Sequence, residues 1–113
     1  MKFLSVYKST TNQMGPEAQA RMGQLVEESM KSGALVLTGG ILPVAMGGAR
    51  VKATGGHVVV DGPFTETKEI TGGFAILEAK SREEAIELAK RFLAIAGDGE
   101  CEMHQLSLYG DQR

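Results

Sequence analysis

The stretch Gly73-Phe74-Ala75-Ile76-Leu77-Glu78-Ala79-Lys80-Ser81-Arg82-Glu83-Glu84 decides the fold of this chain. Its first seven residues, 73–79, combine aromatic, β-branched and aliphatic side chains, which predicts a strand. Ser81 and Glu84 stand at the spacing of a capping box, in which two side chains satisfy backbone N–H groups at the start of a helix. A strand that runs directly into a helix is therefore the unit around which the rest of the chain is placed.

The residues that follow predict the rest of this helix and a closing strand. Apolar residues recur at helical spacing before Gly97 ends the pattern, at Ala85, Leu88, Ala89, Phe92 and Leu93. Acidic residues stand early in this segment and basic residues stand late, as the helix dipole favours. We expect residues 101–109 to form the last strand.

The same strand, helix and strand order precedes this unit. Residues 2–8 are rich in Phe, Leu, Val and Tyr and predict a strand. Pro16 suits a first helical turn, and a helix is predicted over residues 16–32. Its apolar positions before Gly33 are Ala18, Met22, Leu25, Val26 and Met30. Residues 34–39 predict a second, well-buried strand.

An inserted hairpin separates the two halves. Residues 50–54 and 57–61 alternate around Gly55-Gly56, a pair that can adopt the positive φ angles of a tight turn. Residues 1–113 are therefore interpreted as one α+β domain with a ferredoxin-like βαββαβ order and an inserted β-hairpin.

Composition excludes several classes of partner. The 113 residues are 42% hydrophobic and 23% charged, which suits one globular domain. With a formal net charge of −2 and a pI near 5.7, the chain lacks the clustered basic residues that direct nucleic-acid binding needs. The apolar run at the N-terminus is too short for a signal peptide or a membrane span, so we expect a cytoplasmic protein without membrane contact.

The sequence contains no motif for a metal or a cofactor. Cys101 is the single cysteine, so it cannot form an internal disulfide, and with His104 it has no recognised metal spacing. The four Gly-Gly pairs match neither a dinucleotide fingerprint nor a phosphate-binding loop. We therefore expect no metal site and no cofactor.

Two helices can cover only one face of a four-stranded sheet, yet the strands are apolar on both faces. The first strand offers Leu4 and Val6 on one side and Phe3 and Tyr7 on the other, and the strand at 73–79 offers Phe74 and Ile76 on one side and Ala75 and Leu77 on the other. An apolar face stays exposed whichever side the helices bury. A homodimer is the expected solution.

The run Asp61-Gly62-Pro63-Phe64-Thr65-Glu66-Thr67-Lys68-Glu69, followed by Gly72-Gly73-Phe74, combines a strand-ending carboxylate, a rigid turn and a charged loop. With the closing strand, it resembles YCII-related proteins of the DGPF subgroup, and the resemblance covers almost the whole chain. It implies a ferredoxin-like unit that pairs as a dimeric α/β barrel, with a cleft between sheet and loops. It fixes the fold and leaves the reaction open.

The resemblance carries two further implications. DGPF proteins are often encoded beside, or fused to, extracytoplasmic-function sigma factors, which implies a regulatory setting. Some YCII-like proteins pair an aspartate with a histidine on the first helix, an arrangement that suggests acid/base chemistry. The predicted first helix of this chain contains no histidine, so that pair cannot be carried over.

Asp61 is the main candidate for chemistry. An aspartate in a turn normally accepts a hydrogen bond from the backbone N–H two residues ahead, and here that residue is Pro63, which has none. Its carboxylate must find a later amide, a cation such as Lys68 or Arg50, water or a ligand. Two interpretations stay open: a turn-stabilising residue, or a ligand contact or general base.

Six further residues are candidate ligand contacts, each with a structural alternative. Arg50 and Lys68 could hold an anion and Glu69 could accept a proton, but charges on loops and strand edges are usually solvated or paired. Phe64 could stack on a ligand or anchor the loop to the core. His57 lies at the hairpin tip, about 13 Å from Asp61 along the strand, and His104 is interpreted as a hydrogen-bonded sheet residue or a cleft acid/base.

Two classes of function follow. The first is a non-catalytic module that binds a small polar or anionic ligand, or docks onto a regulatory protein of a sigma-factor system. The second is a lyase- or isomerase-like enzyme in a dimer cleft, with Asp61 as acid/base. The missing histidine favours the module.

Overall fold

The computed structural model describes residues 1–9, 14–61 and 72–109. The elements in these ranges are β1 (Lys2–Ser9), α1 (Pro16–Ser32), β2 (Leu35–Ile41), β3 (Arg50–Thr54), β4 (His57–Asp61), β5 (Gly72–Glu78), α2 (Arg82–Ala96) and β6 (Gly99–Gln105). The predicted α+β class and the order of the elements are confirmed.

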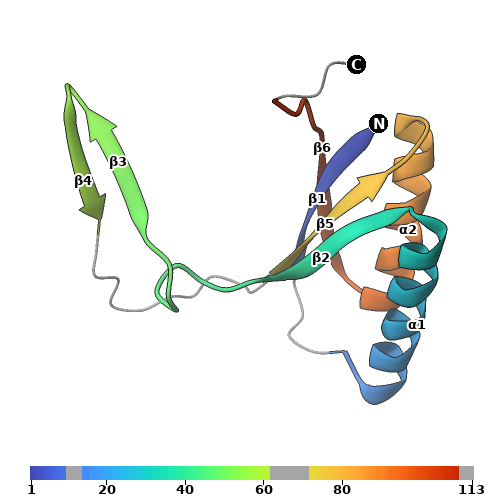
Figure 1. Ribbon diagram of the computed structural model, residues 1–113. Helices are drawn as coiled ribbons and strands as arrows, with labels where there is room; N and C mark the ends of the chain where they lie inside the picture. The colour runs from blue at the N-terminus through green and yellow to red at the C-terminus, as the bar shows by residue number, and fades with distance from the viewer. Residues whose placement is uncertain (10–13, 62–71, 110–113) are drawn as a thin grey trace.

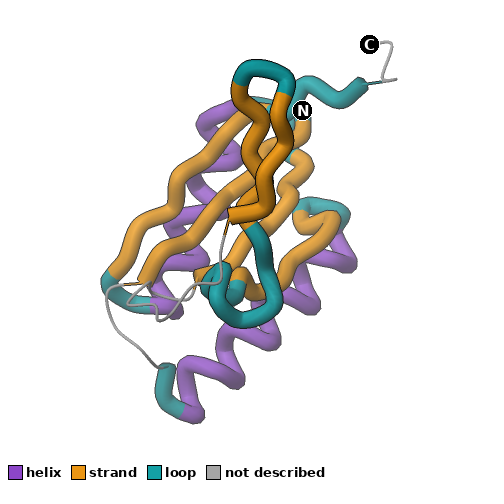
Figure 2. Tube along the Cα trace, turned by 90° about the vertical axis from the view of Figure 1, so that its left-hand side faces the viewer, coloured by secondary structure: helices purple, strands orange, loops and turns teal. Residues whose placement is uncertain are grey.

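Four strands form one antiparallel sheet in the order β2-β5-β1-β6, and β3 and β4 form a separate two-stranded ribbon. Both helices lie on the same side of the sheet, and in the part of the chain that the structure describes no element covers the other side (Figures 1 and 2). This second side is called the open face below. The sequence expectation that one apolar sheet face remains uncovered is thus met within a single chain.

The last strand is shorter than predicted. The N–H of Leu106 donates to the carbonyl oxygen of Lys2 at 2.8 Å, but β1 begins at Lys2. Among the described residues, no strand therefore lies beside 107–109 with which they could pair, and β6 ends at Gln105. The prediction of a strand as far as residue 109 was wrong for this reason.

The helix signals in the sequence correspond to observed caps. The Ser81 hydroxyl accepts a hydrogen bond from the N–H of Glu84 at 3.1 Å, and the Glu84 carboxylate accepts one from the N–H of Lys80 at 2.9 Å. Gly33 ends α1 in the left-handed conformation, with φ of 86°. These contacts satisfy backbone groups that would otherwise be unpaired at the helix ends.

One position on α1 differs from the prediction. Met30 was placed on the apolar stripe, but it is 46% exposed, and α1 contains no fully buried residue. Ser29 instead continues the inward side begun by Met22, Leu25 and Val26. The inward side of α1 therefore passes through Ser29 and not through Met30. It faces a cavity between the sheet and the helices.

Paired residues form three rows on the side of the sheet that faces the helices. The first row is Leu35, Leu77 and Phe3, the second is Thr38, Ala75, Ser5 and Met103, and the third is Gly40, Gly73, Tyr7 and Cys101. The first row supplies three of the five residues of the buried core, with Ala79 and Ala85 as the others. The second and third rows are mostly small. The packed core is therefore confined to one end of the layer between sheet and helices.

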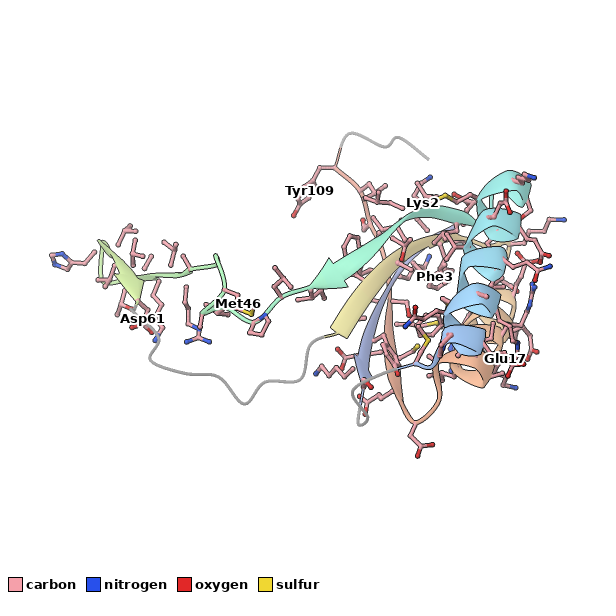
Figure 3. All side chains as sticks on the ribbon, turned by 90° about the horizontal axis from the view of Figure 1, so that it is seen from below. Lys2, Phe3, Glu17, Met46, Asp61 and Tyr109 are labelled. Atoms are coloured by element: carbon pink, nitrogen blue, oxygen red, sulfur yellow. The ribbon has the colours of Figure 1, made fainter. Side chains whose placement is uncertain are left out.

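The β3–β4 ribbon, called the arm below, projects away from the sheet (Figures 1 and 3). Gly55 and Gly56 have φ angles of 57° and 85°, so the predicted glycine turn is confirmed. The Cα radius of gyration is 16.6 Å, against roughly 13 Å for a compact chain of about this length. The arm therefore extends the molecule well beyond its sheet and helices.

Replacing Gly72 with alanine is expected to destabilise the protein by about 1–3 kcal/mol, because the added Cβ would overlap the backbone carbonyl oxygen of Tyr7 on the neighbouring strand. Gly23→Ala in α1 serves as the control. Its Cβ would meet nothing within 4 Å, and alanine favours a helix over glycine by up to about 1 kcal/mol. Urea denaturation should show opposite signs for the two variants, and equal stabilities would contradict the close strand approach at Gly72.

Candidate functional site

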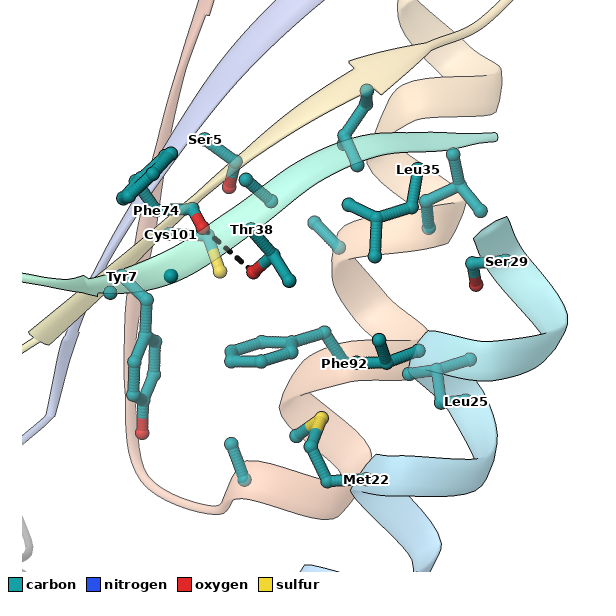
Figure 4. Close-up of a pocket in the computed structure, with 18 of the residues that line it drawn as sticks. Ser5, Tyr7, Met22, Leu25, Ser29, Leu35, Thr38, Phe74, Phe92 and Cys101 are labelled. Carbon is teal, nitrogen blue, oxygen red and sulfur yellow. Dashed lines mark hydrogen bonds between the residues drawn. The ribbon is translucent and has the colours of Figure 1, made fainter. Parts of the chain in front are cut away.

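A cavity of about 370 Å³ lies between the helices and the second and third rows of the sheet (Figure 4). Its walls on α1 include Met22, Leu25 and Val26, and α2 contributes residues that include Phe92. Pockets for small ligands commonly measure about 300–1,000 Å³ and are mainly apolar. The cavity has the size and the character of such a pocket.

The sequence creates this cavity through the sizes of its strand residues. Gly73 and Ala75 occupy helix-facing positions of β5, where the next such position is Leu77. Gly40 stands opposite Gly73 on β2. Protein interiors are otherwise packed as densely as organic crystals. The small residues therefore leave a space that the helix side chains do not reach.

A few polar groups interrupt the apolar wall. The Thr38 hydroxyl donates to the carbonyl oxygen of Phe74 at 2.8 Å, and the Tyr7 hydroxyl donates to the carbonyl oxygen of Asp98 at 3.4 Å. Ser5, which is only 7% exposed, and Cys101 also line the cavity. None of the described lining residues carries a formal charge. The cavity therefore offers hydrogen bonds without a fixed charge.

Burial raises the pKa of the Cys101 thiol above its usual value, and a hydrogen bond with Ser5 acts in the opposite direction with a smaller effect. The thiol is therefore neutral near pH 7. Because the thiolate is the reactive form of cysteine, Cys101 is suited to packing against a ligand and not to nucleophilic attack.

An aromatic pair forms one end of the cavity. The rings of Tyr7 and Phe92 meet edge to face, with centroids 4.9 Å apart and an interplanar angle of 78°. Both residues line the cavity, and Figure 4 shows them together between the sheet and α2. Such pairs hold their rings in a defined orientation. A flat, apolar part of a ligand would find its main contact surface here.

The candidate residues of the hairpin lie on the arm and not in this cavity. The Asp61 carboxylate is 3.3 Å from Lys52 Nζ and 3.9 Å from Arg50 Nη1. His57 pairs with Thr54 beside the turn, at the other end of β4. The structure thus brings Arg50 and Asp61 together, as predicted for a cation partner, and adds Lys52. Within one chain Asp61 is therefore ion-paired, and both of its interpretations, as a turn-stabilising residue and as a ligand contact or general base, stay predictions.

His104 lies on the exposed side of β6. Its Nε2 is 3.1 Å from Oε1 of Glu102, and its paired residue on β1 is Leu4. The prediction of a hydrogen-bonded sheet histidine agrees with this contact. The remaining predicted site residues, Phe64, Lys68 and Glu69, lie outside the described residues.

Sequence reasoning missed the cavity residues, among them Ser5, Tyr7, Thr38, Phe92 and Cys101. The available signal was a run of small or polar residues at alternate strand positions, namely Ser5 on β1 and Gly73 and Ala75 on β5. These positions become one wall only when strand order and register are known, and neither follows from a single sequence.

Asp61→Asn is expected to change the free energy of unfolding by less than about 1 kcal/mol, because exposed ion pairs contribute little to stability. Binding of the neutral dye Nile red to the cavity should be unchanged, since Asp61 does not line it. Urea denaturation and dye titration measure the two effects. A large loss of binding would instead support the interpretation of Asp61 as a ligand contact.

Fold and cavity together define a small α+β protein with a partly open cavity of ligand size between its sheet and its helices. The chain belongs to the YCII-related family, whose domain matches residues 1–102. A relative, the uncharacterised protein R00369 of Rhizobium meliloti (strain 1021), is 33% identical over 70 residues, which is 61% of this chain and 56% of that protein. The match therefore spans little more than half of the relative's length.

Among solved structures, the chain is similar to the 5-chloro-2-hydroxyhydroquinone dehydrochlorinase from Burkholderia phenoliruptrix AC1100, solved in complex with 2,5-dihydroxybenzoquinone. The sequence identity is 20%, the TM-score is 0.45, and the match covers 95% of this chain and 94% of the other.

Within residues 1–9, 14–61 and 72–109, no group of three or more His, Cys, Asp or Glu side chains is placed to hold a metal ion. Neither described helix is long and apolar enough to cross a membrane.

Proposed function

We propose that this protein is a non-catalytic module that binds a small molecule in the cavity between its sheet and helices. The cavity itself carries the proposal, since apolar residues of the sheet and of both helices line it. It is partly open to solvent, so water enters it when no ligand is bound. A bound molecule would remove the apolar lining from water, which contributes about 25 cal/mol per Å² of buried apolar surface.

The chemistry of the wall indicates the class of ligand. Apolar side chains and the Tyr7–Phe92 pair suit a ring-sized apolar body, while the Ser5 and Thr38 hydroxyls and the Cys101 thiol suit one or two hydrogen-bonding substituents. The sequence predicted a small polar or anionic ligand held by Arg50 or Lys68. Because no described lining residue is charged, the cavity favours a neutral, amphipathic molecule.

The absence of an activated catalytic group in the described lining favours binding over catalysis. Cys101 is a neutral thiol, and no histidine, aspartate or glutamate is among the described lining residues. The alternative, a lyase- or isomerase-like enzyme with Asp61 as acid/base, would require the arm to bring Asp61 to a cavity. Assignment to the DGPF subgroup and to a sigma-factor system rests on the Asp61-Gly62-Pro63-Phe64 motif and is part of the proposal.

We also propose that two ferredoxin-like units pair as a dimeric α/β barrel in which the open face of each unit is turned toward the partner. The antiparallel order β2-β5-β1-β6 supports the ferredoxin-like assignment. On the open face, Leu37, at 51% exposure, stands beside Ile76, which pairs with Leu4. Ile76 and Leu4 are partly buried, and adjoining apolar side chains of this kind on an uncovered sheet face commonly mark an interface.

A thermal-shift screen tests the proposed function. Neutral ring-sized metabolites should raise the melting temperature of the wild type and of Asp61→Asn alike, because ligands that bind the native state stabilise it. Small carboxylates and phosphates serve as the comparison set. A shift with these anions that Asp61→Asn abolishes would instead place Asp61 in a ligand site, and turnover of a bound compound that Asp61→Asn abolishes would favour the enzyme. A lack of any shift would contradict the cavity as a ligand site.

A further inference from the structure

The arm is an amphipathic ribbon. Paired residues on two antiparallel strands share a face, so the register of β3 and β4 assigns each side chain to one side. One side carries only the apolar residues Val51, Ala53, Val58 and Val60. The other side carries Arg50, Lys52, Thr54, His57, Val59 and Asp61. The four side chains of the arm that titrate or carry charge, Arg50, Lys52, His57 and Asp61, all lie on this polar side, and Asp61 forms ion pairs with Lys52 and Arg50.

No described part of the same chain covers the apolar side of the arm. Val51, Val58 and Val60 are 62%, 70% and 66% exposed. A single two-stranded hairpin is at best marginally stable in water. It usually needs further strands, or another element packed against its apolar face. In antiparallel sheets, a side that carries only apolar residues is commonly the side that packs on a core, and the polar side faces solvent. The pattern therefore indicates a partner surface that a single chain does not supply.

We propose that the apolar side of each arm packs against the open face of a second copy of this chain. Every copy carries both surfaces, the arm and the open face, and a two-fold axis would cover both at once. The inference rests on the proposed dimer and deepens it, because it names the segment that each subunit lends to the other.

The dimensions suit this exchange. Five residues of extended chain span about 17 Å, and the three gaps between four strands span about 14 Å. The arm is therefore long enough to cover the apolar residues of the open face on β2, β5 and β1, and it need not bury Glu102 and His104 on β6. Its polar side, with the ion pairs of Asp61, then faces solvent. An arm that projects from its own sheet, as in Figure 3, is in a position to reach another molecule.

Three consecutive valines provide a matched test. Val58 and Val60 lie on the apolar side of the arm, and Val59 lies between them on the polar side with 57% exposure. Val58→Glu and Val60→Glu should weaken the dimer at least tenfold in light scattering over a dilution series, whereas Val59→Glu should not. If the wild type is a monomer at micromolar concentration, the dimer and the arm proposal both fail. If the wild type is a dimer and the three variants behave alike, only the arm proposal fails.

Crosslinking identifies the surface that the arm contacts. In a Cys101→Ser background, the double variant Val60→Cys/Leu37→Cys should form a covalent dimer with a short bismaleimide, because Leu37 lies on the open face. Neither single variant should do so, and Val59→Cys/Leu37→Cys is the control for the polar side. A covalent dimer of Val60→Cys alone would show that arms pack on arms, which overturns the proposal.

Discussion

Phe3→Ala should lower the free energy of unfolding by about 3–5 kcal/mol, the usual cost of deleting a buried aromatic ring. Phe3 is 4% exposed and is the largest of the five residues in the core. A core this small has few other contacts with which to compensate, so the loss is a large fraction of a typical total stability. Urea denaturation of the purified protein measures it.

Tyr109→Ala is the control for Phe3→Ala, because Tyr109 is fully exposed and its loss should change stability by no more than about 0.5 kcal/mol. If Phe3→Ala does not fold, Phe3→Leu keeps the test available, since it removes less volume and should fold with a smaller loss. A stability equal to the wild type for both Phe3 variants would show that the core lies elsewhere.

Ala75→Leu should abolish binding of Nile red, and of any ligand found by the screen, while the protein stays folded. Ala75 lies in the second row, between Ser5 and Thr38, and lines the cavity. The leucine side chain would occupy part of the cavity, so it need not displace packed neighbours. The free energy gained by burying it offsets any local strain. Dye titration and the melting temperature, measured together, separate blocked binding from unfolding.

Ala94→Leu is the matched control for Ala75→Leu. Ala94 lies on the exposed side of α2, so this substitution adds the same atoms outside the cavity. It should bind the dye as the wild type does. If a folded Ala75→Leu protein binds the dye as the wild type does, the cavity is not the binding site.

Local signals in the sequence predicted the elements well. The capping pair at Ser81 and Glu84 and the turn at Gly55-Gly56 depend on residues a few positions apart, and both were found as expected. Periodicity also placed α1, but it assigned Met30 to the buried stripe. Helical spacing alone cannot decide which side of a helix faces a packed core and which faces a cavity.

Features that depend on strand pairing could not be predicted. The cavity arises because Gly40, Gly73 and Tyr7 meet in one row, and these residues are far apart in sequence. Local sequence instead indicates Asp61, because Pro63 lacks the N–H that an aspartate in a turn usually binds. Its partner Lys52 became evident only once the register of β3 and β4 placed the two side chains on the same side of the arm.

The residues that form the packed core and the residues that line the cavity lie at different ends of the same strands. Phe3 in the first row and Tyr7 in the third are four residues apart, about 13 Å along β1. Substitutions at that separation usually act independently of one another. Selection or design can therefore change the molecule that this protein accommodates by altering Gly40, Gly73 or Tyr7, while the residues that hold the scaffold together stay as they are.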